Sequence, residues 1–354
     1  MSTPWEDAAI RDGLLDDLCS DATVVGWSEG PHRTSEFLDA RNIAFRALVQ
    51  NHGVEVLAAE TGFTDGLVTQ RYLDDDAAVT LSEATHCMWI WNDRPLTQNR
   101  DLLEWMYAHN RRRPADAVRF VGIDMCGGRF GRFARAHIGL GQALAVAARI
   151  SPRALGARTE VAPLLPLFTA DDYRRLTGRQ ADTITAVITE LTEVLASLDP
   201  HDPDVAIALR QCAIAAHHDA NFRHDPTTWS MGIRDAAQFE NLRWTLNRLC
   251  APRKVMVFEQ VSHLEPHNPV SLGHAIRAAH GDRAVLVAAA WGDGTDSRAS
   301  RDTARLSSAV ARWLPASENG PILIDLRRDS PLRPHAAGFD AVLYVRQPTS
   351  ASPL

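Results

Sequence analysis

Seven short runs of apolar residues constrain the fold of this chain more than any other feature of its sequence. They cover Ala22–Trp27, Val54–Ala59, Val118–Ile123, Lys254–Phe258, Ala284–Trp291, Ile322–Leu326 and Ala341–Val345. Their apolarity is continuous rather than alternating, which is the pattern of strands buried on both faces. Between the first two runs, apolar residues recur at spacings of three and four up to His52-Gly53, which predicts a helix. We predict an α/β fold with a mostly parallel central sheet flanked by helices.

The span between the third and fourth runs has a different pattern. It contains no convincing strand but several amphipathic stretches, including Asp182–Leu198 and Pro203–Asn221. We predict a single α/β domain over residues 1–354, with a helical insertion or cap at residues 130–249. The last residues, Gln347–Leu354, are expected to be frayed.

Composition and charge argue against several classes of protein. The formal net charge is -7 and the basic residues are scattered, so the chain lacks the electrostatic footprint of a nucleic-acid-binding protein. No apolar stretch is long enough to cross a membrane, and the acidic segment Met1–Asp17 does not have the pattern of a secretion signal. The five cysteines form no Cys-x-x-Cys pair, which fits a reducing compartment and gives no sign of zinc or redox chemistry. We expect a cytoplasmic protein without metal or cofactor that acts on a small molecule; its oligomeric state is left open.

Polar residues follow four of the predicted strands, at the edge where ligands bind in open α/β sheets. The first run leads to Ser28, Glu29 and His32, the second to Glu60, the third to Asp124, and the fourth to Glu259, Gln260 and His263. Any one of these acids could be a helix cap or a solvated residue. Together they place carboxylates and imidazoles at one edge, which predicts a functional site there.

The turn Glu29-Gly30-Pro31-His32 can direct a carboxylate and an imidazole into one pocket. His32 could then act as a general base toward water, with carboxylates orienting it and raising its basicity. Arg41 follows on the next predicted helix and could neutralise a substrate carboxylate or a developing oxyanion. Alternatively, Arg41 pairs with a structural acid.

Three further motifs suggest other chemistry. Gly26-Trp27-Ser28-Glu29-Gly30 matches the G-x-S-x-G elbow of serine hydrolases, but no earlier strand-helix loop is available to supply an oxyanion amide, so Ser28 is the less favoured nucleophile. Gly127–Gly131 lacks the spacing of a phosphate-binding loop, so we interpret it as a turn. Adjacent residues on a helix point about 100° apart, so we interpret His217-His218-Asp219 as a solvated helical face rather than a metal cluster.

A series of recognisable motifs extends over almost the whole chain. It begins with Ser28–Phe37 and continues with Ala58-Ala59-Glu60, Trp89-x-Trp91, Leu103-Glu104-Trp105, His109-Asn110, Val121-Gly122-Ile123-Asp124-Met125, Arg234-Asp235, Glu240-Asn241-Leu242-Arg243-Trp244 and Phe339-Asp340-Ala341-Val342. The first motif is similar to the Gly-Glu-x-x-His-Gly-x-x-Glu-Phe signature of erythromycin esterases and their relatives. Order and spacing together make the chain resemble this family.

The resemblance implies a parallel-sheet core with added helices and metal-independent hydrolysis of a macrocyclic lactone by activated water. By position in the motifs, it implies that His32 is the general base and that Glu29, Glu60 and Arg41 orient the base and the substrate. We place His263 beside Arg41, at the carbonyl oxygen of the substrate. The residues expected to contact the substrate are Ser28, Arg33, Asp124, Arg234, Glu259 and Gln260.

The chain departs from the family pattern at three positions. Family members typically carry His-Asn-x-His after the fourth strand, and here Gln260 replaces the first of these histidines while His263 keeps the second. Ser28 and Arg33 replace the two glycines of the signature. These larger side chains should narrow the mouth of the pocket and change its charge. Two alternatives to an ester or lactone hydrolase therefore stay open. One is a biosynthetic enzyme that uses the same pocket for elimination, cyclisation or acyl transfer. The other is a protein that binds a ligand or a divalent metal through Glu29, His32, Glu60, Asp124 and His263.

Overall fold

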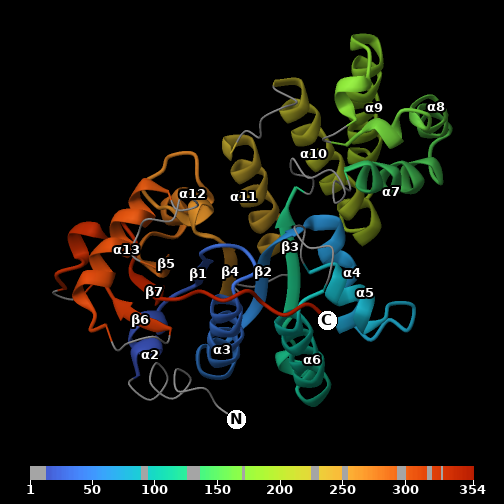
Figure 1. Ribbon diagram of the computed structural model, residues 1–354. Coiled ribbons are helices and arrows are strands. Elements are labelled where there is room, and N and C mark those ends of the chain that lie inside the picture. Colours follow the sequence, from blue (N-terminus) through green and yellow to red (C-terminus); the bar gives the residue numbers. More distant parts are fainter. Residues whose placement is uncertain are drawn as a thin grey trace.

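The predicted sheet is present in the structure. The computed structural model describes residues 13–88, 95–125, 136–169, 172–224, 231–248, 254–292, 300–316, 321–327 and 330–354. In these residues seven strands form one sheet in the order β3-β2-β4-β1-β5-β7-β6 (Figure 1). The strands are β1 (Val24–Glu29), β2 (Val54–Gly62), β3 (Arg119–Asp124), β4 (Lys254–Gln260), β5 (Ala284–Trp291), β6 (Ile322–Asp325) and β7 (Ala341–Val345). All neighbouring strands are parallel except β6 and β7, so the predicted mostly parallel α/β fold is confirmed.

The order of the strands places β1 and β4 at the point where the chain changes direction across the sheet. From β1 the chain passes through α3 (Ser35–His52) to β2 on one side, whereas from β4 it passes to β5 on the other side. Gly53 caps the C-terminus of α3; its φ of 66° is left-handed, and its N–H donates to the carbonyl oxygen of Leu48. The carboxyl ends of β1 and β4 therefore flank the kind of crevice in which open α/β sheets bind ligands.

Helices cover the sheet and fill the long connection between β3 and β4. In that connection the described residues form helices and no strand: α7 (Ala136–Ala148), α8 (Pro152–Val161), α9 (Gly178–Ala196), α10 (Pro203–His224) and α11 (Met231–Arg248). Side chains of α7 to α10 form a hydrophobic cluster separate from the one around the sheet, and these helices stand beyond the end of β3 in Figure 1. The assignment of residues 130–249 as an insertion within a single domain stays a prediction.

The remaining α-helices of the described residues lie in the other connections between strands, apart from α2, which precedes β1. They are α2 (Leu14–Cys19), α4 (Phe63–Leu73), α5 (Leu81–His86), α6 (Thr97–Arg112), α12 (Leu272–His280) and α13 (Arg301–Trp313). Among the described residues, no helix combines the length and the apolarity that crossing a membrane requires.

The last residues of the chain are held in place, so the prediction of a frayed tail is wrong. After β7 the chain crosses the N-terminal ends of α3 and α6 (Figure 1). The N–H of Ser35 donates to the carbonyl oxygen of Thr349 at 2.8 Å, and the N–H of Ala351 donates to that of Arg33 at 2.8 Å. The carboxylate of Glu36 accepts from the N–H and the hydroxyl of Thr349 at 2.9 and 2.5 Å. The tail is held by hydrogen bonds of backbone and polar groups. Such contacts produce no apolar pattern from which an ordered tail could be predicted.

We expect removal of residues 348–354 to lower the free energy of unfolding by about 2–4 kcal/mol, because several hydrogen bonds worth about 1 kcal/mol each are lost. Urea unfolding measures the change. Ser352→Ala is the control, since it keeps the backbone of the tail and should stay within about 0.5 kcal/mol of the wild type. A truncated protein with the wild-type unfolding midpoint would show that the tail does not hold the turn at Arg33.

Candidate active site

The carboxyl ends of the strands bring most of the predicted polar residues together. In the sheet register, Ser28 lies beside Glu259 and Glu29 lies beside Gln260. Carboxylate and ring-nitrogen atoms of Glu29, His32 and Glu60 lie within 4.8 Å of one another, as do those of Glu60, Glu259 and His263. Glu60 therefore joins two groups. With the residues that contact them below, they form what we call the acid-histidine cluster: Glu29, His32, Glu60, Asp124, Arg234, Asp235, Glu259 and His263.

The turn after β1 holds His32 against Glu29. Nδ1 of His32 lies 2.7 Å from Oε1 of Glu29, and the two side chains are 32% and 1% exposed. The turn requires glycine at position 30, because a Cβ there would lie 2.6 Å from the ring of Trp291 and 2.7 Å from that of Phe37. His32 is thus the solvent-facing member of a pair whose carboxylate is buried.

The surroundings raise the pKa of both members of this pair. Burial raises the pKa of the Glu29 carboxyl, although the hydrogen bond with His32 opposes it. Burial alone would lower the pKa of His32, but the Glu60 carboxylate and the hydrogen bond with Glu29 outweigh burial and raise it above its ordinary value of 6.5. The two carboxylates therefore make His32 a stronger base.

Arg33 occupies a backbone conformation that explains the glycine of the family signature. Its φ is 65°, in the left-handed region, where a residue with a Cβ is less stable by about 1–2 kcal/mol. Its side chain is exposed. The hydrogen bond from Ala351 to the carbonyl oxygen of Arg33 helps to hold this conformation. The predicted effect of Arg33 on the pocket mouth stays a prediction.

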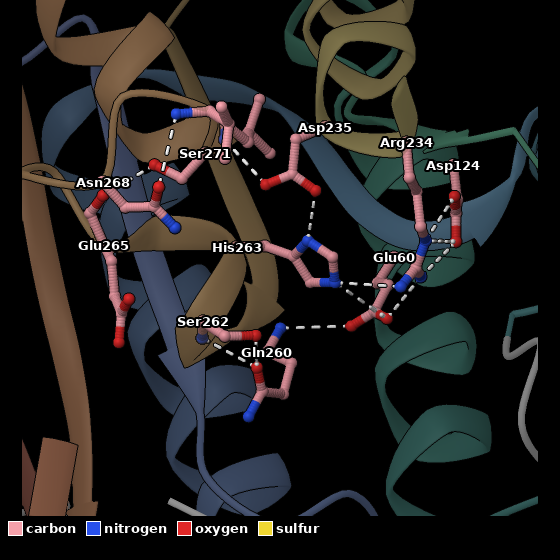
Figure 2. A network of polar contacts seen from close by, with 12 residues as sticks. Glu60, Asp124, Arg234, Asp235, Gln260, Ser262, His263, Glu265, Asn268 and Ser271 are labelled. Carbon is pink, nitrogen blue, oxygen red and sulfur yellow. Dashed lines mark hydrogen bonds and ion pairs between the residues drawn. The ribbon is translucent and has the colours of Figure 1, made fainter. Parts of the chain in front are cut away.

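The guanidinium of Arg234, on α11, is the centre of a buried network (Figure 2). Nε donates to Oδ1 of Asp124 at 3.0 Å, and Nη2 donates to Oδ2 of Asp124 at 2.5 Å. Nη2 also donates to Oε1 of Glu60 at 2.6 Å, and Nη1 donates to Nε2 of His263 at 2.9 Å. Burial acts to raise the pKa of Glu60, but the charge of Arg234 outweighs it and holds that pKa well below the ordinary value. The sequence suggested that Arg234 and Asp124 contact the substrate. In the structure the two side chains form hydrogen bonds with each other.

His263 is fixed in one tautomer by its two neighbours. A guanidinium can only donate, so Nε2 of His263 accepts from Arg234 and Nδ1 donates to Oδ1 of Asp235 at 2.6 Å. Oδ2 of Asp235 in turn accepts from the N–H of Leu272 at the start of α12, at 3.0 Å. Both ring nitrogens are engaged, so this arrangement leaves His263 no donor for a substrate carbonyl, which was its predicted role. Sequence reasoning missed Asp235 because it lies inside a helix, although it directly follows Arg234 in a quoted motif.

Arg41 lies outside the acid-histidine cluster. Its Nε and Nη2 donate to Oδ1 of Asn42 at 3.0 and 2.8 Å, and Nη2 also donates to Oδ1 of Asn99 at 2.9 Å. The guanidinium lies 4.9 Å from the centre of the Phe258 ring. Burial lowers the pKa of Arg41 to about 10, and the charge of Glu29 opposes this. The cation that directly contacts the strand-end carboxylates is therefore Arg234, and Arg41 acts on Glu29 only at longer range.

Ser28 and Gln260 are engaged with the backbone. Ser28 is fully buried and its Oγ donates to the carbonyl oxygen of Val287 in β5 at 2.7 Å, an arrangement that does not expose a nucleophile. The N–H of Gln260 donates to Oε2 of Glu60 at 3.1 Å, and its Oε1 accepts from the N–H of Ser262 at 2.7 Å (Figure 2). Gln260 thus caps the short helical turn that carries His263.

Glu259 is a buried carboxyl group with unsatisfied oxygens. It is 0% exposed, and neither of its oxygens has a hydrogen-bond partner among the described residues. Burial, reinforced by the carboxylates of Glu60 and Asp124, raises its pKa well above the ordinary value. Because an unpaired buried charge is costly, the site favours the neutral carboxylic acid.

We expect Glu259→Gln to raise the free energy of unfolding, by an amount that grows with pH. Since the folded pKa lies above the unfolded one, Glu259 contributes stability that is fully present below the unfolded pKa and is lost as the pH rises toward the folded pKa. The variant loses this dependence, so its advantage should grow by up to about 1.4 kcal/mol per pH unit. Urea unfolding from about pH 4 to pH 8 measures the difference. For the exposed control Glu160→Gln we expect no such trend, and a Glu259→Gln advantage that does not change with pH would contradict a neutral Glu259.

His218 and Asp219 of the motif on α10 are buried and His217 is half-buried, so the predicted solvated helical face is wrong. His218 is fully buried, its Nε2 contacts the carbonyl oxygen of Met125, and its ring stacks on Phe222. Asp219 is also buried and accepts from the hydroxyl of Thr185 at 2.6 Å. These residues belong to no group of potential metal ligands in the described part of the chain. The other motif weighed with it, Gly127–Gly131, lies outside the described residues, as do Trp89 and Trp91.

Comparisons with known proteins bear on both family and fold. The family model described as erythromycin esterase matches residues 49–337. A mutant of the erythromycin esterase EreC in its open conformation is similar with a TM-score of 0.74 and 16% identity, over 97% of this chain and 95% of that one. A succinoglycan biosynthesis protein gives a TM-score of 0.73 and 14% identity over 99% and 94% of the two chains. A protein from Bacillus cereus gives 0.72 and 16% over 99% and 96%. At these identities the structures show a shared fold.

Proposed function

This chain belongs to the erythromycin esterase family, and from that membership we propose that it is a hydrolase that opens a carboxylic ester or lactone with water activated by His32. The observation that carries the proposal is the partly exposed His32, hydrogen-bonded to a buried carboxylate at the carboxyl edge of the sheet. A small-molecule substrate, of macrolide type or another natural product, and a cytoplasmic location are part of the proposal.

The proposed mechanism uses His32 as base and then as acid. When Nδ1 donates to Glu29, Nε2 is the basic nitrogen of the ring. Nε2 takes a proton from water while the water oxygen adds to the ester carbonyl. The tetrahedral intermediate then expels the alkoxide, which takes the proton back from Nε2. One water is consumed, and one acid and one alcohol are formed.

The buried network around Arg234 supports the role of His32 as a base. Glu60 carries a negative charge close to His32, because Arg234 holds the pKa of Glu60 low. This charge favours the imidazolium that forms in the transition state. Arg234, Asp124, Asp235 and His263 are therefore proposed to position Glu60 rather than to contact the reacting atoms.

The position of Arg234 argues against a metal ion at one of the two groups of potential ligands. A metal ion held by Glu60, Glu259 and His263 would need Nε2 of His263, which already accepts from Arg234. The same guanidinium forms an ion pair with Glu60 at 2.6 Å. A fixed cation thus takes up ligand atoms that a metal would need.

A second candidate is a biosynthetic enzyme that uses the same pocket without adding water. The observation behind it is Gln260, which stands where family members typically carry a histidine and which caps its own turn here. A succinoglycan biosynthesis protein shares this fold.

The test is a panel of macrolides, simple lactones and carboxylic esters incubated with the protein in ¹⁸O-labelled water and analysed by mass spectrometry. Hydrolysis is expected to place one labelled oxygen in the acid product, and dialysis against a chelator is expected to leave the rate unchanged. A product without the label would favour the second candidate. Loss of activity on chelation, restored by added metal, would contradict the metal-free mechanism.

A further inference from the structure

A surface groove beside α13 is lined by positively charged side chains. It has a volume of about 810 Å³, within the range of small-molecule sites. Its ionisable lining residues are Arg301, Arg305, Arg312, His267, His335 and Asp302. None of the described residues that line it belongs to the acid-histidine cluster. The groove is therefore a separate feature, and its chemistry is independent of the reaction proposed at His32.

Helix α13 presents its arginines on a single face. Arg301, Arg305 and Arg312 lie four and seven residues apart, so at 3.6 residues per turn they share one side of the helix over about 16 Å. The opposite side of α13 carries Leu306 and Val310, which are buried in the hydrophobic cluster of the sheet. The groove wall is thus a row of guanidinium groups on a helix whose orientation is fixed by packing.

The single acid of the lining is already engaged. Oδ2 of Asp302 lies 2.7 Å from Nε2 of His267, and its Oδ1 lies 3.5 Å from Nη1 of Arg305. Nδ1 of His267 faces the carbonyl oxygen of Ala337 at 2.9 Å. Within the described residues neither Arg301 nor Arg312 forms an ion pair, and the groove keeps an excess of cations.

Two of the arginines are placed unfavourably on the helix when no ligand is bound, although Asp302 in the first turn and Arg312 in the last turn suit the helix dipole. Arg301 lies in the first turn of α13, where the helix dipole disfavours a cation. Arg301 and Arg305 are like charges four residues apart, which also disfavours the helix. An anion in the groove would relieve both effects. Guanidinium groups pair with phosphate and carboxylate oxygens through two parallel hydrogen bonds, which favours these groups over other anions.

We propose that this groove binds a small molecule that carries two or more phosphate or carboxylate groups. Two anionic groups are required because the arginines are spread along the helix and a single group would reach only one end of the row. The ligand bridges the guanidinium groups of α13 and the side chains of His267 and His335 on the other lining segments.

Isothermal titration with pyrophosphate, citrate and acetate at low ionic strength tests the proposal. The groove variant is Arg305→Ala with Arg312→Ala. The matched control is Arg149→Ala with Arg175→Ala, two arginines that are 64% and 66% exposed on the helical segment between β3 and β4. We expect pyrophosphate or citrate to bind the wild type and the control alike, and the groove variant to bind at least about tenfold more weakly, since each lost guanidinium removes charge-assisted hydrogen bonds.

Tighter binding of pyrophosphate assigns the ligand to the phosphates, and tighter binding of citrate assigns it to the polycarboxylates. No binding of either at millimolar concentration overturns the proposal, as does equal affinity of the groove variant and the wild type. Acetate binding as tightly as either overturns the requirement for two anionic groups. Circular dichroism of both double variants confirms that the exposed substitutions leave the fold intact.

Discussion

Replacing His32 with glutamine is expected to lower kcat by about 10²–10⁴-fold without unfolding the protein. The glutamine amide can still donate to Glu29, but it cannot take a proton from water. Its side chain replaces one that is 32% exposed, so the free energy of unfolding should change little. The measurement is kcat on the substrate found in the panel, with circular dichroism as the check on folding. His201→Gln, at an exposed histidine before α10, is the control and should keep wild-type activity.

The pH dependence of the reaction should carry the signature of the same residue. Only the neutral imidazole accepts a proton, so kcat/KM should fall as the pH drops through the pKa of His32. Because Glu60 and Glu29 raise that pKa above 6.5, the acid limb should lie above pH 6.5. Glu29→Gln removes one of the two carboxylates and should move the limb to lower pH. Full activity of His32→Gln, or an acid limb that does not move in Glu29→Gln, would contradict His32 as the base.

The strands could be predicted from the sequence because burial on both faces leaves only one pattern. All seven predicted runs are strands in the structure, and the errors lie at their ends. The second run was predicted to end at Ala59, whereas β2 continues to Gly62. Glu60 and Thr61 are buried and polar. A strand predicted from its apolar residues alone therefore ends too early at the point where the strand reaches the site.

The position of a residue along an element could be predicted better than the partners of its side chain. The polar strand ends could be placed at one edge, because parallel strands share their direction. Arg41 lies on its predicted helix, but its guanidinium contacts asparagines rather than a carboxylate. Asp235 could not be recognised, because its role depends on α11 crossing the strand ends, and periodicity within α11 says nothing about that crossing.

Burial between helices was the other effect that local patterns could not show. His218 and Asp219 have a polar sequence, yet the connection between β3 and β4 forms a hydrophobic cluster of its own, and α10 is one of its members. Polar residues enter such a cluster when each finds a partner, as Asp219 does with Thr185. The partners are distant in the sequence, so the buried face of α10 becomes visible only in the structure.

Arg234→Met is expected to cause the largest loss of stability, about 3–5 kcal/mol, because it leaves buried carboxylates without their cation. Arg234 is 3% exposed and contacts Asp124 and Glu60 at 2.5 and 2.6 Å. The matched control is Arg149→Met, whose ion pair with Asp204 spans 3.3 Å between side chains that are 64% and 65% exposed. A surface pair of this kind contributes at most about 1 kcal/mol. Urea unfolding of both variants gives the comparison, and equal losses would show that the buried network is not the source of the stability.

Two further variants separate the charge of Arg234 from its shape. Arg234→Lys keeps the charge but replaces the planar fork with a single ammonium, which cannot bridge Asp124, Glu60 and His263 together, so only part of the stability should remain. Adding Asp124→Asn to Arg234→Met removes one uncompensated charge and should recover part of the loss. Without the guanidinium, the pKa of Glu60 is no longer held down, so Glu60 supports the protonated form of His32 less. The positive charge of Arg234, which itself lowers the pKa of His32, is lost as well. The acid limb of Arg234→Met, where that variant folds, should therefore move more than that of Arg234→Lys, which keeps the charge, whereas a purely structural role for the network would move neither.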